Sequence, residues 1–258
     1  MTQNRPDYQS RYELVDLERK DGILCVRLHS GDGPLRWGLN AHREFETIFR
    51  DIADDRENRV VIITGTGDEF IGPKGSFGGS DQVGKLTPRQ FDDLRPGAHQ
   101  MLLDLLRIDV PVICAVNGPA VRHAEIPALC DIVLASDTAS FQDSSHFINH
   151  MPPGDGQHVI MPLVMGMNRA RYYLLMGEEI SAERALQFGL VNEIHPPDLL
   201  MDRAWDVARS LARQPILNLR ATRRILTKQI RRAMEDLLEY GLDLEGFALV
   251  DPEAETHG

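Results

Sequence analysis

The sequence has few cysteines and no long apolar stretch. Cysteine occurs three times in 258 residues, which excludes a disulfide framework and leaves at least one thiol unpaired. The longest continuous apolar run covers seven residues, 110–116, whereas a membrane-spanning helix needs about 20. The N-terminus also lacks the apolar segment of a signal peptide. These absences predict a protein without a membrane partner that works in the reducing cytoplasm.

Positive charge is scarce relative to negative charge. The chain has 28 Lys and Arg residues against 39 Asp and Glu residues, which gives a formal net charge of −11. This balance argues against nucleic acid and anionic membranes as main partners. Hydrophobic residues at 42% and charged residues at 26% are typical of globular proteins and exclude a disordered chain. At roughly 150 residues per domain, the length predicts one or two domains.

Short apolar and β-branched runs alternate with segments of helical periodicity over the first three quarters of the chain. Strands are expected at 23–28, 60–64, 112–116, 132–135 and 190–194. Helices are expected at 41–53, 91–106, 202–212, 216–234 and 235–249. The alternation predicts an α/β fold with an inner parallel sheet, and no strand after His195. We therefore expect a core over 1–196 and a helical C-terminal region over 197–258.

Most polar residues with catalytic potential follow the strand 112–116, at the sheet edge where open α/β folds usually bind ligands. His123 and Glu125 are two residues apart, so helical spacing predicts that they point to different sides and that only one faces a pocket. The stretch 141–158 carries three histidines and two aspartates among turn-forming residues. A His–Asp pair from it can take a proton from water. The residues alone do not decide which His pairs with which Asp.

Other chemistries have weaker support. A metal site would use His146, His150 and His158, but Pro152 and Pro153 oppose a regular helix through the first two, and no Glu follows His146. Hydrogen-bonded structural histidines are an open alternative. The sequence has no nucleophile elbow, Walker sequence or dinucleotide fingerprint. The basic segment 220–232 predicts a solvated or subunit-contact helix face, or a site for an anionic ligand such as a nucleotide phosphate.

Four segments, in family order and spacing, resemble the crotonase (enoyl-CoA hydratase/isomerase) superfamily. They are 59–65, 111–120, 130–136 and 185–192, within a resemblance that extends over about 12–250. The resemblance implies an α/β fold built as a crotonase (ClpP-like) spiral of ββα units, with a helical C-terminal trimerisation region. It also implies a homotrimer or a dimer of trimers.

The residues that serve CoA-thioester chemistry in this superfamily are altered. Its members carry a glycine run whose backbone N–H helps to form an oxyanion hole, whereas this chain reads Val121-Arg122-His123-Ala124. The hydratases use two glutamates. Glu125 aligns with the first, but Ser145 stands at the second position. The segment 71–77 also departs from the usual oxyanion and adenine-binding sequence.

The altered positions resemble a branch of the superfamily, 6-oxocamphor hydrolase and related β-diketone hydrolases, which cleave C–C bonds in non-esterified diketones. The shared features are Trp37 with His42, the stretch 124–127, the stretch 141–143 followed by His146, and 153–156.

This second resemblance implies a dyad of His146 and Asp155 that activates water, with His123 and Trp37 binding the substrate carbonyl groups. His42, Glu125 and Glu245 match further substrate-binding positions. No metal or organic cofactor is implied.

Three functions remain open. The first, which the residues favour, is hydrolysis of a cyclic or bicyclic β-diketone to a keto acid by retro-Claisen cleavage. The second is an enoyl-CoA hydratase or isomerase with a divergent site that uses Glu125 as acid and base. The third is a non-catalytic module of the same fold that binds an acyl-CoA, RNA or a protein partner.

Overall fold

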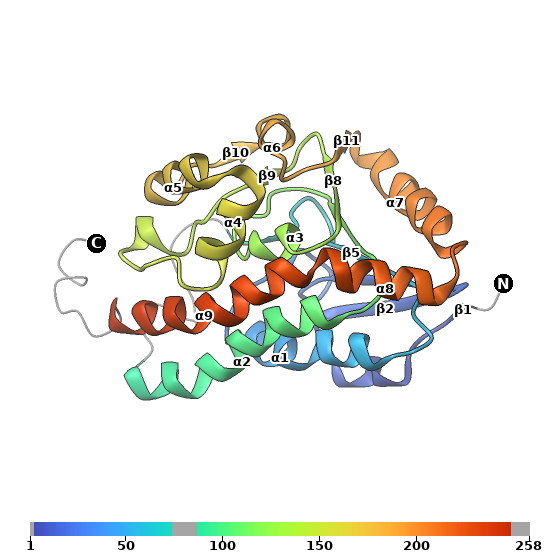
Figure 1. Ribbon diagram of the computed structural model, residues 1–258, viewed down its shortest axis with the longest axis horizontal. Coiled ribbons are helices and arrows are strands. Elements are labelled where there is room, and N and C mark those ends of the chain that lie inside the picture. Colours follow the sequence, from blue (N-terminus) through green and yellow to red (C-terminus); the bar gives the residue numbers. More distant parts are fainter. Residues whose placement is uncertain (1–2, 74–86, 249–258) are drawn as a thin grey trace.

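The structure, a computed structural model, describes residues 3–73 and 87–248 (Figure 1). Its central sheet has the strand order β1-β2-β3-β5-β7-β8-β11. The antiparallel part consists of β1 (Gln3–Asn4), β2 (Val15–Lys20) and β3 (Ile23–Leu28). The parallel part continues from β3 through β5 (Val60–Thr64), β7 (Val112–Val116), β8 (Ile132–Ser136) and β11 (Glu193–His195). Loops after these parallel strands carry most of the predicted site residues.

Short strands form a second layer beside the carboxyl ends of the parallel strands. β4 (Leu35–Arg36) pairs in parallel with β6 (Ile71–Gly72), and β9 (Ser140–Phe141) pairs antiparallel with β10 (Ile180–Ser181). Ala120 bridges to both Ile71 and Phe141 and so links the two pairs. Long strand, short strand and helix follow one another in β3, β4 and α1, and again in β5, β6 and α2. This order is that of the predicted spiral of ββα units.

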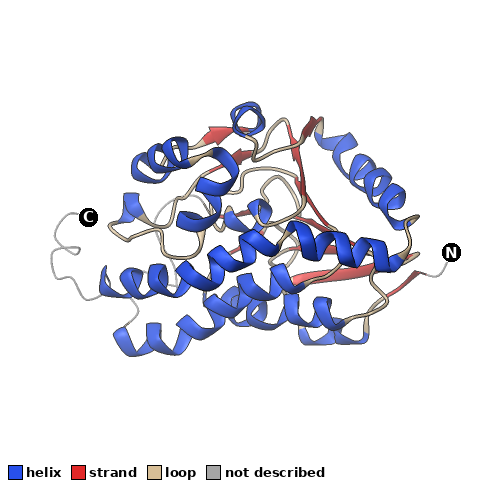
Figure 2. Ribbon diagram, viewed as in Figure 1, coloured by secondary structure: helices blue, strands red, loops and turns tan. Residues whose placement is uncertain are grey.

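Helices surround the sheet (Figure 2). In chain order they are η1 (Asp7–Arg11), α1 (Leu39–Asp54), α2 (Pro88–Arg107), α3 (Glu125–Ala128), η3 (Phe147–Asn149), α4 (Gln157–Met165), α5 (Met167–Met176), α6 (Ala182–Phe188), α7 (Pro197–Ala212), α8 (Ile216–Leu226) and α9 (Lys228–Ala248). Within the described ranges, none combines the length and the apolar character that a membrane crossing requires. In Figure 1, α8 and α9 follow one another across the front of the molecule, and α2 packs beside α9.

Apolar side chains cover both faces of the sheet. β5 and β7 are buried along their whole length, as is typical of parallel strands that are covered on both sides. Phe45 and Phe49 of α1 belong to the core on one face. Leu200 and Ala204 of α7 pack with Ile62 on the other face. The helical C-terminal region thus shares a core with the sheet, and its division from the rest at residue 197 stays a prediction.

Glycines bring α9 against the loop that precedes α4. A Cβ on Gly154 would lie 2.3 Å from the carbonyl oxygen of Gly241 in α9, so only glycine permits this approach. Gly156 then turns the chain into α4 with a φ of +97°, a conformation that also favours glycine. Asp155 lies between these two glycines, and the close packing of the backbone on α9 therefore fixes its position.

The strands predicted at 23–28, 60–64 and 112–116 are confirmed. The last predicted strand begins too early, because the backbone N–H groups of Leu190 and Val191 bond back to the Ala185 carbonyl oxygen of α6 and pairing starts only at Glu193.

The helix predicted over 216–234 is wrong in its bounds. α8 ends at Leu226, where the Thr227 hydroxyl donates to the Arg223 carbonyl oxygen at 2.8 Å, and α9 begins at Lys228. α9 then continues through the predicted break at 234. As predicted, no strand follows His195 within the part of the chain that the structure describes.

The basic face predicted over 220–232 is, in part, an internal contact. Arg223 is buried, and its Nε donates to the Asp131 carboxylate at 2.6 Å. Its Nη1 donates to the carbonyl oxygens of Leu106 and Ile108 at the end of α2. The guanidinium therefore joins α8 to the α2–β7 connection. At this position the prediction of a solvated or ligand-binding face is wrong, because the opposing carboxylate comes from the same chain.

Replacement of this buried cation should be costly. Arg223→Ala should lower the free energy of unfolding by roughly 3 kcal/mol, because it leaves a partly buried carboxylate without its cation and carbonyl groups without their donor. Arg224→Ala is the matched control, since the neighbouring guanidinium is 63% exposed and should contribute less than about 1 kcal/mol. Urea unfolding of both variants at one protein concentration measures the difference. Equal losses would contradict the role assigned to Arg223.

Candidate active site

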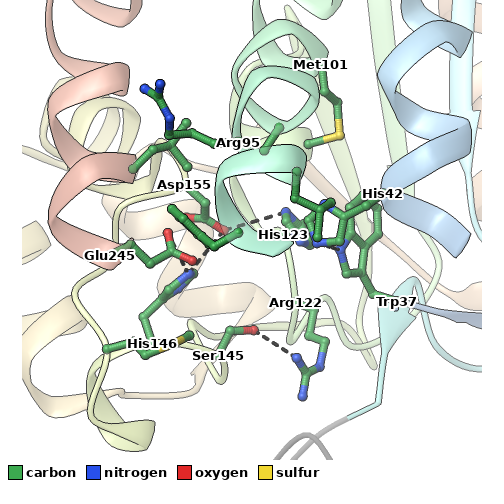
Figure 3. A pocket seen from close by; sticks show the side chains of 15 residues that line it. Trp37, His42, Arg95, Met101, Arg122, His123, Ser145, His146, Asp155 and Glu245 are labelled. Carbon is green, nitrogen blue, oxygen red and sulfur yellow. Dashed lines mark hydrogen bonds and ion pairs between the residues drawn. The ribbon is translucent and has the colours of Figure 1, made fainter. Parts of the chain in front are cut away.

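A pocket with a cavity of about 50 Å³ lies between α2, α9 and the loops that follow the parallel strands (Figure 3). Its apolar wall includes Phe91, Leu94, Ala98 and Met101 of α2 and Leu242 of α9. Its polar lining includes Trp37, His42, Arg122, His123, Ser145, His146, Asp155 and Glu245. Every predicted site residue except Glu125 therefore lines one pocket, although the chain supplies these residues from four separate regions.

Trp37 and His42 form a hydrogen-bonded pair on one side of the pocket. The Trp37 indole N–H donates to Nε2 of His42 at 3.0 Å. Burial lowers the pKa of His42 to about 3, so this ring is neutral and accepts at Nε2. The Trp37 ring also packs against His123, with ring centroids 3.8 Å apart. Trp37 thus positions two histidines, and in this structure its N–H is already used by His42.

His123 faces the pocket with Glu125 behind it. Nδ1 of His123 lies 2.5 Å from Oε1 of Glu125 and 3.6 Å from Oδ2 of Asp155. Glu125 is fully buried. The expectation that only one of the pair faces a pocket is confirmed, but the expectation that they point apart is wrong. His123 precedes α3 in a left-handed conformation, with a φ of +50°, so helical spacing does not apply to it.

His146 has carboxyl groups near both ring nitrogens. Nδ1 lies 2.7 Å from Oδ1 of Asp143. Nε2 lies 3.6 Å from Oδ2 of Asp155 and 3.8 Å from Oε2 of Glu245. Figure 3 shows Asp155 and Glu245 approaching this ring from the same side. The predicted partner Asp155 therefore faces Nε2, whereas the hydrogen bond that orients the ring comes from Asp143.

Asp143 is the partner of His146 that the residues alone left open and that the resemblance did not select. Its carboxylate also accepts the backbone N–H groups of Ser145 and His146, each at 3.3 Å. The available signal was its place two residues after the strand that ends at Phe141 and three residues before His146. Asp143 thereby holds both the ring of His146 and the turn that carries it.

The charges of Asp143 and His146 stabilise each other. Burial alone would lower the pKa of His146, but the carboxylates of Asp155 and Asp143 raise it well above the ordinary 6.5. Burial alone would raise the pKa of Asp143, but the charge of His146 and the donated hydrogen bonds lower it. Asp143 is therefore the ionised partner, and an imidazolium at His146 is strongly stabilised.

The other carboxyl groups have raised pKa values. Burial raises the pKa of Asp155 to about 6 and the pKa values of Glu125 and Glu245 to about 8. Burial lowers the pKa of His123 to about 4. The pocket therefore combines a basic imidazole at His146 with a neutral one at His123. Perturbed titratable groups of this kind are concentrated at functional sites.

One group of side chains has the composition of a metal site. Ligand atoms of His123, Glu125 and Asp155 lie within 4.8 Å of one another. His123 and Glu125 already contact each other at 2.5 Å, so a metal would have to replace that contact. The other set considered, with His150 and His158, does not gather among the described residues. His150 is exposed, and His158 contacts the carbonyl oxygens of Pro153 and Leu237.

Ser145, at the position of the second hydratase glutamate, accepts a hydrogen bond from Arg122 at 3.2 Å. Arg122 also donates to the carbonyl oxygen of Pro73 at 2.9 Å. Of the altered segment 71–77, residues 74–77 lie outside the described residues.

Asp143→Asn should lower the pKa of His146, because it removes a charge that opposes the effect of burial. The raised pKa of His146 contributes stability that is complete below the ordinary 6.5 and is lost as the pH rises through the folded-state value. The stability advantage of the wild type over this variant should therefore be largest in mildly acidic solution. NMR titration of labelled histidine and urea unfolding across pH measure the two effects.

Glu193→Gln provides the control, since Glu193 contacts His195 at 2.8 Å outside the pocket. It should leave the pKa of His146 unchanged. An unchanged pKa of His146 in Asp143→Asn would show that Asp143 does not set the protonation of His146.

Comparison with known sequences reveals relatives over most of the chain. The model of the enoyl-CoA hydratase/isomerase family matches residues 20–249. Carnitinyl-CoA dehydratase from Shigella flexneri is 28% identical over 231 residues, which are 88% of this chain and 85% of that protein. The protein of the same name from Escherichia coli strain K12 gives the same identity and coverage.

Among solved structures, a β-diketone hydrolase from the cyanobacterium Anabaena sp. PCC 7120, bound to (S)-3-oxocyclohexyl acetic acid, superposes with a TM-score of 0.92. It is 41% identical, and the match covers 97% of this chain and 99% of that one. An enoyl-CoA hydratase/isomerase from Mycobacterium paratuberculosis shares the fold, with a TM-score of 0.84 at 24% identity over 94% of this chain and 96% of that one. The chain belongs to the enoyl-CoA hydratase/isomerase family, the crotonase superfamily.

Proposed function

We propose that the protein hydrolyses a C–C bond of a cyclic or bicyclic, non-esterified β-diketone by retro-Claisen cleavage. The observation that carries the proposal is a single pocket that both His146 and His123 line. Of these two rings, His146 is the more basic. His146 is oriented through Nδ1 by ionised Asp143, and its Nε2 points toward Asp155 and Glu245. The β-diketone hydrolase that is 41% identical over nearly the whole chain supports this choice of chemistry.

The first step is general-base attack by water. Since Asp143 accepts the Nδ1–H of His146, Nε2 has the lone pair that takes a proton from water. The hydroxide forms a bond to one carbonyl carbon of the diketone. The carboxyl groups of Asp155 and Glu245, at 3.6 and 3.8 Å from Nε2, stabilise the imidazolium that results. Asp155 thus acts together with His146, as the resemblance implied. It does so from the Nε2 side of the ring, where the proton is transferred, and not from the Nδ1 side.

The second step breaks the C–C bond. The tetrahedral oxyanion collapses to a carboxylic acid, and the bonding electrons pass to the central carbon as an enolate that the second carbonyl delocalises. A hydrogen-bond donor at His123 stabilises this charge, and such a donor is typically worth about 3–4 kcal/mol. The imidazolium of His146 returns its proton to the enolate carbon. The product is a keto acid, and the proposed cycle needs no metal or organic cofactor.

Hydration or dehydration of a CoA thioester is the second candidate, because the matched family and the carnitinyl-CoA dehydratases point to it. That chemistry would need Glu125 to reach the substrate. Glu125 instead contacts His123, and Ser145 replaces the second glutamate. These two features favour the diketone over a CoA thioester.

We also propose the homotrimer, or dimer of trimers, that the family resemblance implies. Leu217 and Ile225 of α8 are 76% and 73% exposed in the single chain, and a subunit contact would cover such side chains.

His146→Asn should lower the turnover of a bicyclic 1,3-diketone by about 10²–10⁴-fold, because general-base catalysis contributes that much. His150→Asn is the matched control. It makes the same substitution four residues away at an exposed histidine with a left-handed backbone and should leave the rate unchanged. Loss of enolate absorbance measures turnover. Since neutral His146 is the base and its pKa is raised, the rate should increase as the pH rises above 6.5.

Crotonyl-CoA serves as the competing substrate in the same assay, with and without a chelator. Full diketone turnover by His146→Asn would refute the assignment of the base. Crotonyl-CoA hydration without diketone turnover would favour the second candidate, and loss of diketone turnover on chelation would refute the metal-free cycle.

A further inference from the structure

The contact between Glu125 and His123 is a short polar contact at the pocket that the proposed cycle does not use. Glu125 is 0% exposed, and it is not one of the side chains that line the pocket. Its Oε1 lies 2.5 Å from Nδ1 of His123. Its other oxygen, Oε2, is buried without a hydrogen-bond partner among the described residues. An ionised carboxylate in this position would leave one oxygen without any donor, which is energetically costly.

Burial opposes ionisation of Glu125, whereas the neighbouring charges act in both directions, since His146 favours ionisation and Asp143 opposes it. The titratable and charged groups that face it or His123 come from six regions of the chain: Arg122, His42 of α1, Asp143 and His146 after β9, Asp155 before α4, Tyr173 of α5 and Glu245 of α9. Asp143 already carries a negative charge there. Among the described residues, the hydrogen-bond contact of a second buried carboxylate at Glu125 would be with the neutral His123 and not with a cation.

We propose that Glu125 is a positioning residue that acts as a neutral carboxylic acid, donating its proton to Nδ1 of His123 and thereby keeping a hydrogen on Nε2. This inference rests on the proposed function, in which Nε2–H of His123 stabilises the oxyanion and the enolate. A neutral imidazole carries one ring hydrogen, so an acceptor role at Nδ1 fixes the donor role at Nε2.

In their neutral forms, the two histidines of the pocket then have opposite tautomers. Asp143 is ionised and accepts from Nδ1 of His146, so Nε2 is a base when that ring is neutral. Glu125 is protonated and donates to Nδ1 of His123, so Nε2 of that ring is a donor. The two carboxyl groups occupy equivalent positions at 2.7 and 2.5 Å from Nδ1. Their protonation states alone separate the two catalytic roles.

The electrostatics agree with this geometry. Burial raises the pKa of Glu125 to about 8 and lowers that of His123 to about 4. Around neutral pH, Glu125 is therefore the protonated member of the pair. Ionisation above pH 8 would turn Glu125 into an acceptor and move the ring hydrogen of His123 to Nδ1. The proposal thus predicts a loss of activity on the alkaline side that originates at Glu125.

The tautomer is tested directly on the unliganded protein by solid-state ¹⁵N NMR with labelled histidine, with the His123 signals assigned by their absence in His123→Gln. At pH 7 we expect a neutral His123 ring with its hydrogen on Nε2. For His146 we expect either a neutral ring with its hydrogen on Nδ1 or an imidazolium. A hydrogen on Nδ1 of His123, or a doubly protonated His123, overturns the proposal. Because this measurement needs no substrate, it is decisive even if the protein cleaves no diketone.

The second test compares Glu125→Gln with Glu125→Leu in diketone turnover. The amide of Gln can donate to Nδ1 as the acid does, so Glu125→Gln should lose less than about tenfold at pH 7, whereas Glu125→Leu should lose about 10²-fold or more in kcat. The alkaline loss of activity should disappear in Glu125→Gln, because an amide does not ionise.

Glu245→Gln tests the competing origin of the alkaline loss, since burial raises the pKa of Glu245 to a similar value, about 8. If Glu125 is the origin, Glu245→Gln retains that loss, whatever its rate at pH 7. Persistence of that loss in Glu125→Gln, or its disappearance in Glu245→Gln instead, overturns the role of Glu125. Absence of diketone turnover in the wild type would refute the proposed function and leave the tautomer to be decided by NMR.

Discussion

Carboxyl groups removed from water are the constraint on which the rest of the site depends. Glu125, Asp143 and Glu245 are buried, and Asp155 lies among them. Carboxyl groups buried in so small a volume cannot all ionise, so protons are distributed among them and the neighbouring imidazoles. Asp143 remains ionised because it accepts two backbone N–H groups and the ring of His146. Burial raises the pKa values of the other carboxyl groups, which favours their neutral forms.

The fold makes this arrangement possible by supplying a rigid frame. Parallel strands buried on both faces end at one edge, and α9 returns from the far end of the sequence to pack on α2 and α4. The contact of Gly154 with Gly241 leaves no space for a side chain, so Asp155 and Glu245 are held at short range. Repulsion between the charged forms of these two carboxyl groups is thereby opposed by the packing of the backbone and not by screening in solvent.

Much of the fold could be predicted because its signals are local. The apolar runs 60–64 and 112–116 are short, rich in β-branched residues and, as predicted, form buried strands. The end of α8 could not be predicted, since the hydrophobic periodicity continues past Thr227 and α9 begins directly after it at Lys228. Arg223 was predicted as surface because its partner Asp131 lies 92 residues away.

Most residues that line the pocket were predictable through family resemblance, whereas their pairings were not. His146 has Asp143 three residues before it and Asp155 nine residues after it, and only the backbone of the turn decides which one reaches Nδ1. In the same way, the left-handed backbone at His123 reverses the expectation from helical spacing. The Trp37–His42 hydrogen bond likewise depends on where β4 meets α1.

The apolar wall on α2 has a consequence for how this kind of pocket diversifies. Phe91, Leu94, Ala98 and Met101 shape the cavity, yet none of these side chains can gain or lose a proton. The acid–base groups come from other elements, which are tied together by hydrogen bonds and close backbone contacts. Substitutions along one helix face can therefore alter the shape of the cavity without disturbing the buried carboxyl and imidazole groups. Selection for a new substrate can act on one helix while the reaction itself is inherited unchanged.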